Sequence, residues 1–214
     1  MKKVFMATIF SSALLLSACS GQNASEELDN VLQETFSAEK EYRDTQSEME
    51  KLEKDEQQLF ESIMGLTQEQ QEEVSGKAEE AMESADQRLE LLKTENESIK
   101  DAQEEFKAID AVIEETDEES LKTDLTELKT KMQERFEAHS DFAAAYEELT
   151  GLQKELYDML LNEETELQSL QEKAMEVNEK NTAVQESVEV FNERTEQFNE
   201  MKDKVIEELE KEEK

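Results

Sequence analysis

The 214-residue sequence contains no proline and no tryptophan, only four glycines, one histidine and one cysteine. Flexible polar tracts are usually rich in proline and glycine, so their scarcity argues against disorder even though 38% of the residues are charged. A single cysteine excludes an intramolecular disulfide. The abundant residues are Glu, Lys, Leu, Gln and Ala, and this composition is typical of long helices and coiled coils.

Positive charge is also scarce. The sequence has 23 basic and 58 acidic residues, which gives a formal charge of −35. Residues 1–18 contain Lys2 and Lys3 and no acids, so their removal would leave 21 basic groups and a charge of −37. Such a field opposes binding to nucleic acid and to anionic lipid surfaces, which both depend on Lys and Arg. Divalent cations and basic proteins are the partners that this charge permits.

The single cysteine, Cys19, follows a short apolar segment. Lys2 and Lys3 precede a mostly apolar run over residues 4–16, which is too short to span a hydrocarbon core of about 30 Å. A basic start, an apolar run and small residues before a cleavage point are typical of a signal peptide. We therefore predict that residues 1–18 are a cleaved signal peptide.

The tetrad Leu16-Ser17-Ala18-Cys19 resembles a bacterial lipobox. In such signals the cysteine thiol receives a diacylglyceryl group, and a peptidase then cuts before the cysteine. Two acyl chains are sufficient for stable anchoring, since each buried CH2 contributes about 0.8 kcal/mol. The alternative is an ordinary secretory signal followed by a chance cysteine. The tetrad predicts a lipid anchor at Cys19 on the extracytoplasmic face of the cell membrane, with residues 19–25 as the lipidated cysteine and a flexible tether.

Residues 26–214 are predicted to form one helical domain. Apolar residues recur at alternating three- and four-residue steps, which is the spacing of one helix face. Four such runs follow one another, over residues 28–63, 74–113, 121–160 and 167–209. They predict an all-α fold, an elongated antiparallel coiled-coil-like bundle of four helices in up-and-down order. A three-helix bundle with a projecting hairpin, and an open hairpin that closes by dimerising, are the alternatives.

Two turns are predicted from capping residues. Gly65 is placed for a left-handed helix C-cap, and Thr67 with Gln70 is placed for a capping box that starts the next helix. Residues 114–120 have no apolar side chain, and Thr116 with Glu119 repeats the capping pattern there.

The third turn has two candidate positions. One lies near Asn162, which would be the N-cap of the last helix, and the other lies at Gly151. The apolar spacing continues through Gly151, and a lone glycine inside a helix costs only about 1 kcal/mol. Asn162 is therefore favoured.

The sequence offers no catalytic grouping. One histidine excludes a ferritin-type di-iron site, which needs two Glu-x-x-His motifs, and excludes the usual structural zinc sites. His139 lies on the apolar stripe between Phe136 and Phe142, so we interpret it as a packing histidine with one satisfied ring nitrogen rather than as a pH switch. Four scattered glycines cannot form a phosphate-binding loop. We predict a protein that is not an enzyme and that holds no metal or cofactor.

Three stretches resemble the YkyA family of cell-wall-binding lipoproteins of Gram-positive bacteria. They are KLEKDEQQLFESIMGL (51–66), LLKTENESIKDAQEEFKAI (91–109) and LLLSAC (14–19). The resemblance covers essentially the full length and implies a helical bundle tethered outside the membrane that binds the cell wall. It brings no ligand residue to this sequence apart from the lipidated cysteine.

The negative charge of the chain restricts which component of the cell wall it can bind. Gram-positive walls carry anionic teichoic acids, which repel a chain of −37 unless Mg²⁺ or Ca²⁺ bridges the two. Peptidoglycan itself or another envelope protein is the more favourable partner. We therefore expect a membrane-anchored, non-enzymatic spacer or wall-binding module. The alternative is a helical adaptor or regulator of an envelope protein such as a wall hydrolase or a transporter.

Overall fold

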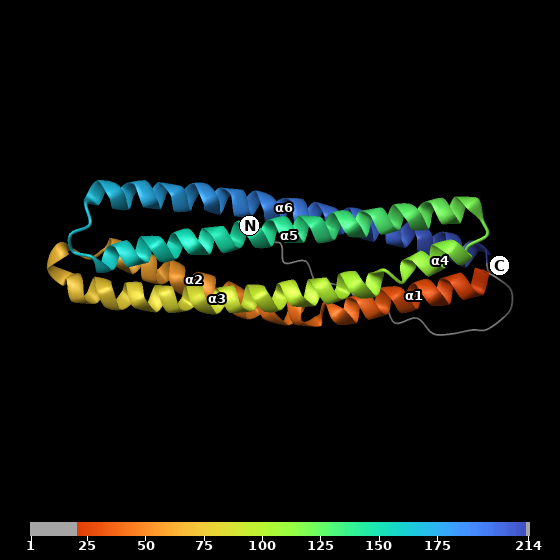
Figure 1. The fold of residues 1–214 in the computed structure, drawn as a ribbon, viewed down its shortest axis with the longest axis horizontal. Coiled ribbons are helices and arrows are strands. Elements are labelled where there is room, and N and C mark those ends of the chain that lie inside the picture. Colours follow the sequence, from red (N-terminus) through yellow and green to blue (C-terminus); the bar gives the residue numbers. More distant parts are fainter. Residues whose placement is uncertain (1–20, 213–214) are drawn as a thin grey trace.

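A computed structural model describes residues 21–212 of the chain as helices joined by short turns (Figure 1). In chain order the elements are α1 (Gly21–Ala38), α2 (Lys40–Met64), the 3-10 turn η1 (Gln68–Gln70), α3 (Gln71–Phe106), α4 (Ile109–Glu115), α5 (Glu119–Leu161) and α6 (Leu167–Glu212). Within this range there is no β-strand. The prediction of an all-α fold is confirmed.

The elements form four antiparallel rows: α1 with α2, α3 with α4, α5 alone and α6 alone (Figure 1). At 1.5 Å per residue, the 43 residues of α5 and the 46 residues of α6 span about 65 to 70 Å. The start of α1 and the end of α6 lie at one end of this rod, the terminal end. The α2–α3 and α5–α6 connections lie at the other, the turn end. The prediction of an elongated up-and-down bundle is confirmed.

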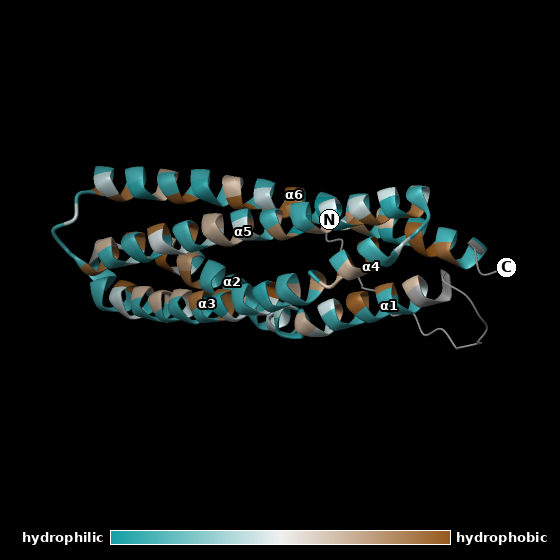
Figure 2. Ribbon diagram, turned by 45° about the vertical axis from the view of Figure 1, so that its right-hand side comes forward, coloured by the Kyte–Doolittle hydropathy of each residue, from teal (hydrophilic) through white to brown (hydrophobic). Residues whose placement is uncertain are grey.

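The rows do not pack equally along the rod. Helix α5 packs along α6 and α3, whereas α3 also packs on α1 and α2, and α6 contacts α1. Figure 2 shows the consequence, with hydrophilic residues over the outer faces of the helices and hydrophobic ones along the seams. The bundle is a closed four-row structure where α1 joins α6, at the terminal end.

Three hydrophobic clusters form the core in succession. The terminal cluster draws residues from α1, α3, α4, α5 and α6, including Leu28 and Leu209. The middle cluster joins Met49 of α2 with residues of α3 and α5 and Val184 of α6. The cluster at the turn end draws its members from α2, α3 and α5 only. The bundle is therefore closed at its terminal end, while the first part of α6 has no buried residue before Val184 and reaches the core through the partly buried Val177.

The connection between α2 and α3 confirms one predicted cap and corrects the other. The Thr67 N–H donates to Oε1 of Gln70 at 3.2 Å, as the capping box requires. Gly65, however, has φ −85° and ψ −10°, which is right-handed, so the predicted left-handed cap is wrong. The Gly65 N–H bonds instead to the Ser62 carbonyl at 3.1 Å, which tightens the last helical turn without a positive φ.

The connection before α5 is capped by a residue that the sequence did not single out. The Glu118 carboxylate accepts from the Leu121 N–H at 2.8 Å, so Glu118 is the N-cap. The Thr116 hydroxyl turns back to the Val112 carbonyl at 2.7 Å and closes α4. The predicted pairing of Thr116 with Glu119 is wrong, because the threonine hydroxyl is used by the preceding helix.

The third turn lies where the apolar spacing placed it. Helix α5 continues through Gly151 and ends at Leu161, with Asn162 as its C-cap. Asn162 is not the N-cap of the last helix, since α6 begins at Leu167. Its side-chain oxygen instead accepts from the Glu164 N–H at 3.0 Å and so stabilises the connecting turn.

Helices α1 and α2 are separated by a kink that was not predicted. The Ser98 hydroxyl of α3 accepts from the Tyr42 N–H at 3.1 Å and donates to the Ala38 carbonyl at 2.6 Å. These two backbone groups would otherwise bond to each other, since they are four residues apart. A side chain inserted into the helical ladder is an established cause of a kink.

Candidate functional site

The predicted lipid-attachment site falls outside the described residues. This applies to Cys19 and to Leu16, Ser17 and Ala18 of the lipobox. Helix α1, the first described element, begins at Gly21, two residues after Cys19 in the sequence. Among the helices of residues 21–212, none is both long and apolar enough to cross a membrane.

His139 is a packing residue, which confirms that part of the prediction; its expected ring-nitrogen hydrogen bond stays a prediction. It is 2% exposed, and the rings of Tyr42, Phe142 and Phe191 surround it edge-on, with centroids 5.5 to 5.9 Å away. Burial, reinforced by Arg135, lowers the pKa of His139 to about 4, so the imidazole is neutral near pH 7. Its Nε2 atom has no hydrogen-bond partner within the described part of the chain.

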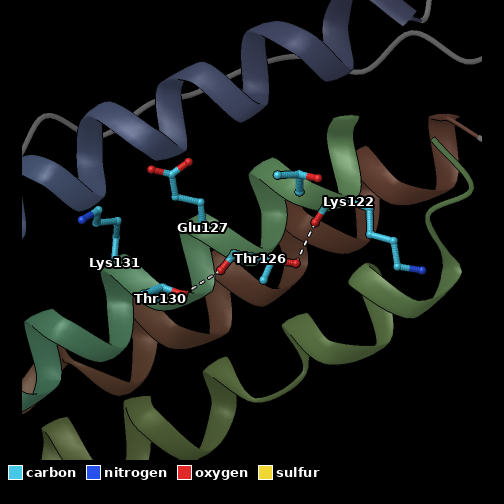
Figure 3. A pocket seen from close by; sticks show the side chains of 6 residues that line it. Lys122, Thr126, Glu127, Thr130 and Lys131 are labelled. Atoms are coloured by element: carbon cyan, nitrogen blue, oxygen red, sulfur yellow. Dashed lines mark hydrogen bonds between the residues drawn. The ribbon is translucent and has the colours of Figure 1, made fainter. Parts of the chain in front are cut away.

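A polar hollow lies on the surface of α5 (Figure 3). It is lined by Lys122, Thr123, Thr126, Glu127, Thr130 and Lys131. The Thr126 and Thr130 hydroxyls donate to backbone carbonyls one turn earlier, at 2.7 and 3.0 Å. Because these donors are already used and every lining residue belongs to one helix, the hollow brings no groups together for catalysis. Residues 21–212 also hold no group of three or more His, Cys, Asp or Glu that is placed to bind a metal ion.

The converging polar groups of this molecule lie in its interior instead. Arg88 of α3 forms an ion pair with Glu56 of α2, and its guanidinium also donates to the Tyr146 hydroxyl at 3.2 Å and to Gln153 at 3.0 Å. The Tyr157 hydroxyl donates to Glu56 at 2.7 Å. Burial raises the pKa of the Glu56 carboxyl, and Arg88 opposes that rise. This network joins α2, α3 and α5 and fixes their relative positions.

Two further buried carboxylates lie near the kink. Glu39 forms a bidentate pair with Arg135 at 2.5 and 3.2 Å, and the Arg135 Nε donates to the Thr195 hydroxyl of α6 at 3.2 Å. Glu95 is 1% exposed and accepts from the Thr45 hydroxyl at 3.0 Å and from the Gln46 amide at 2.7 Å. Burial raises the pKa of Glu95 to about 7; the Thr45 hydrogen bond opposes this rise and Glu53 adds to it.

Sequence reasoning missed these buried charges, although a signal was present. Glu56 falls between Leu52 and Leu59 on the apolar stripe, and Arg88 falls between Ala85 and Leu92. An acidic residue on the apolar stripe of one helix and a basic residue on the apolar stripe of another indicate an ion pair buried between the two helices. Neither Glu56 nor Arg88 lines the hollow on α5 or the hollow between α2 and α3.

Comparisons with known proteins agree with the fold. A 1.6 Å crystal structure of a conserved protein of unknown function from Staphylococcus aureus aligns with a TM-score of 0.75 at 16% identity, covering 89% of this chain and 97% of that one. That likeness shows the fold alone. No curated protein matches the sequence. The family model of YkyA, described as "Putative cell-wall binding lipoprotein", matches residues 23–208. Because this match spans nearly the whole chain, the protein belongs to the YkyA family.

Proposed function

We propose that this protein is a lipid-anchored, non-catalytic lipoprotein of the cell envelope that acts as a spacer or cell-wall-binding module. The observation that carries the proposal is that α1 begins two residues after Cys19 and starts a rod of about 65 to 70 Å. A lipid on that cysteine would hold the terminal end at the membrane and place the turn end far from it. The family description supports both the anchor and the wall as the partner.

The anchor is tested by the variant Cys19→Ala. Without the thiol no diacylglyceryl group can attach, so the variant should appear in the medium or remain uncleaved, while the wild-type chain stays with the membrane. The matched control is Ser20→Ala, which changes the next residue and keeps the thiol. Intact-mass analysis that finds an unmodified Cys19 in the membrane fraction would refute lipidation.

Wall binding is tested with delipidated cell walls, either intact or stripped of teichoic acid. Repulsion between the acidic chain and anionic polymers predicts stronger retention on the stripped wall at low Mg²⁺, and a smaller difference as Mg²⁺ rises. Retention on neither wall at any Mg²⁺ concentration would remove the wall-binding part of the proposal and leave the anchored spacer.

A second candidate, an adaptor for an envelope protein, is favoured by one specific observation. Between Asn162 and Ala183 no residue is buried, and Leu167 and Met175 are 69% and 71% exposed. Apolar side chains left uncovered on a helix are a common binding surface for partner proteins. Crosslinking in intact cells separates the two candidates, because an adaptor should yield one dominant protein partner.

A further inference from the structure

A layer of polar side chains interrupts the hydrophobic core at the level of the kink. On α3, Leu92 belongs to the middle cluster and Ile99 belongs to the terminal one. The buried residues between these two are Glu95 and Ser98, which are both polar. Joined by hydrogen bonds and by the rings of Tyr42 and Phe191, the members of this layer, hereafter the polar layer, are Glu39, Thr45, Glu95, Ser98, Arg135, His139 and Thr195. The polar layer therefore crosses all four rows of the bundle.

The polar layer holds the start of α2 on α3. The Ser98 hydroxyl bonds to the backbone of α2 at the kink, and Glu95, one turn earlier on α3, accepts from Thr45 and Gln46 at 3.0 and 2.7 Å. Between Tyr42 and Met49, α2 gives no residue to either hydrophobic cluster. The docking of this segment on α3 therefore depends on polar contacts rather than on apolar packing.

Glu95 differs from the other buried acids in its partners. Those others within residues 21–212 are each joined to a basic residue, in the pairs Glu39–Arg135, Glu56–Arg88 and Asp124–Lys204. Glu95 forms no ion pair within the same range, and its donors are a hydroxyl and an amide. A charged carboxylate that is buried without a cation is costly, so burial favours the neutral acid and raises the pKa of Glu95 to about 7.

The groups that face Glu95 from α2 bring no positive charge. Glu53 adds a negative charge that raises the pKa of Glu95 further, and its own carboxylate accepts from Tyr146 of α5 at 2.8 Å. Tyr42 is neutral at physiological pH, because burial raises its pKa to about 12. A negative charge on Glu95 is therefore not balanced from this side.

The other rows do not balance that charge either. Arg135 of α5 is engaged by Glu39, at the junction of α1 and α2, in a bidentate pair. His139 of α5 is neutral above about pH 5, because burial lowers its pKa to about 4. Helix α1 packs on α3 through apolar members of the terminal cluster. Ionisation of Glu95 would thus leave an uncompensated charge in the polar layer.

We propose that the polar layer is a pH-responsive hinge in the rod, with Glu95 as the group that sets its state. With a neutral carboxyl, Thr45 and Gln46 hold the start of α2 on α3. With an ionised carboxylate, water enters the layer and the start of α2 separates from α3. The chain yields at the kink, because the backbone bond between Ala38 and Tyr42 is already replaced there by Ser98.

The hinge would control how stiffly the terminal end is joined to the rest of the rod. Acidic conditions would stiffen the joint and alkaline conditions would loosen it. The proposal concerns the helical domain alone and goes beyond the anchor and wall binding. Its failure would leave both of those as they stand.

The test is amide hydrogen exchange of the full chain, isolated from membranes in a non-ionic detergent, between pH 5 and pH 8.5. Dividing each rate by the intrinsic rate at that pH gives protection factors. We expect the protection of residues 42–49 to fall at least about tenfold over this range, because opening releases the raised pKa of Glu95. At pH 8.5 these amides should also be at least about tenfold less protected than those of residues 143–157 in α5, since the hinge opens without unfolding the bundle.

A variant that supplies the missing cation separates the hinge from general effects of pH. Gln46→Lys places an ammonium group beside the Glu95 carboxylate, so the ionised form is paired as Glu39 and Glu56 are. We expect the fall in protection of residues 42–49 to shrink to less than about threefold in this variant. Gln58→Lys makes the same charge change at an exposed position of α2 and should keep the wild-type fall. Glu95→Gln removes the charge itself and should behave like Gln46→Lys.

Three results would overturn the proposal. They are a wild-type fall smaller than about tenfold, equal falls in Gln46→Lys and Gln58→Lys, and equal protection of residues 42–49 and 143–157 at pH 8.5. The last result would assign the pH effect to unfolding of the whole bundle. Circular dichroism at each pH shows whether the variants are folded. If Glu95→Gln does not fold, the two lysine variants still decide, because both change exposed side chains.

Discussion

Arg88 on α3 and Glu56 on α2 form an ion pair inside the bundle, where their side chains are only 2% and 4% exposed. The same carboxylate accepts from Tyr157 of α5, so three helices meet at one pair of charges. A buried pair adds little net stability compared with a well-packed apolar pair, but removing one partner leaves an uncompensated charge. The pair therefore fixes the relative positions of three helices more than it stabilises them.

The first prediction concerns this pair. Arg88→Met should lower the free energy of unfolding by about 3 to 5 kcal/mol, because Glu56 stays buried without its cation. Adding Glu56→Gln should recover most of that loss, since a neutral amide can still accept from Tyr157. Urea denaturation followed by circular dichroism measures both variants. A loss below about 1 kcal/mol in Arg88→Met would show that Glu56 reaches water or is protonated at no cost.

The second prediction concerns pH and Glu95. The pKa of this carboxyl is raised from 4.5 to about 7 in the folded chain. The folded state therefore holds a proton that the unfolded state has released, so stability is lost as pH rises from about 4.5 through about 7. Glu95→Gln keeps an acceptor for Thr45 and Gln46 without the charge. Its unfolding free energy should exceed that of the wild type by roughly 2 to 3 kcal/mol at pH 8 and match it near pH 4.

The control for Glu95 is Glu97→Gln, which removes an exposed carboxylate on the same helix. Its effect on stability should stay within about 0.5 kcal/mol at every pH. If Glu95→Gln and Glu97→Gln shift the pH profile equally, the change reflects net charge and not the buried carboxyl.

The third prediction concerns the kink. Ser98→Ala removes the hydroxyl that lies between Ala38 and Tyr42, and the net loss of its hydrogen bonds should cost about 0.5 to 1.5 kcal/mol. The two backbone groups can then bond directly only if α1 and α2 straighten. Hydrogen exchange at the Tyr42 amide reports whether they do. Ser47→Ala, on the exposed face of α2, is the matched control and should be neutral.

The fourth prediction uses the glycines. A Cβ at Gly151 or Gly76 would have nothing within 4 Å, and both lie inside helices, so Gly151→Ala and Gly76→Ala should each raise stability by about 0.5 to 1 kcal/mol. Gly65→Ala is informative because Gly65 is right-handed, with Ser62 O 3.4 Å from the added Cβ. It should be close to neutral. If Gly65→Ala lowered the free energy of unfolding by about 1 kcal/mol or more, Gly65 would have the left-handed conformation in solution.

The fold was largely predictable because the apolar residues that define it recur with a regular spacing along each helix. The apolar spacing gives one buried stripe per row, and its continuity through Gly151 correctly favoured the turn near Asn162. Caps were less predictable, since the residues around Gly65 suit a right-handed turn as well as a left-handed one. The kink could not be read locally, because its cause is Ser98, about 60 residues along the chain.

The interior polar groups were missed for a different reason. Apolar residues define the stripes, so Glu56 and Arg88 interrupt the pattern and do not stand out as core positions. Whether a charged residue on a stripe is buried depends on a partner from another row, which is a three-dimensional property. The proposed lipid-attachment site is the reverse case, because its signal lies in a short contiguous tetrad and needs no tertiary structure.

The placement of both ends at the terminal end has a mechanical consequence. Leu28 near the start of α1 and Leu209 near the end of α6 belong to one cluster. A force applied between Gly21 and Glu212 would separate the α1–α6 contact one helical turn at a time. The same force applied along the rod, from the terminal end to the turn end, would load whole helices in shear. We therefore expect the bundle to yield at a lower force when these two ends are pulled apart than when it is stretched along its axis.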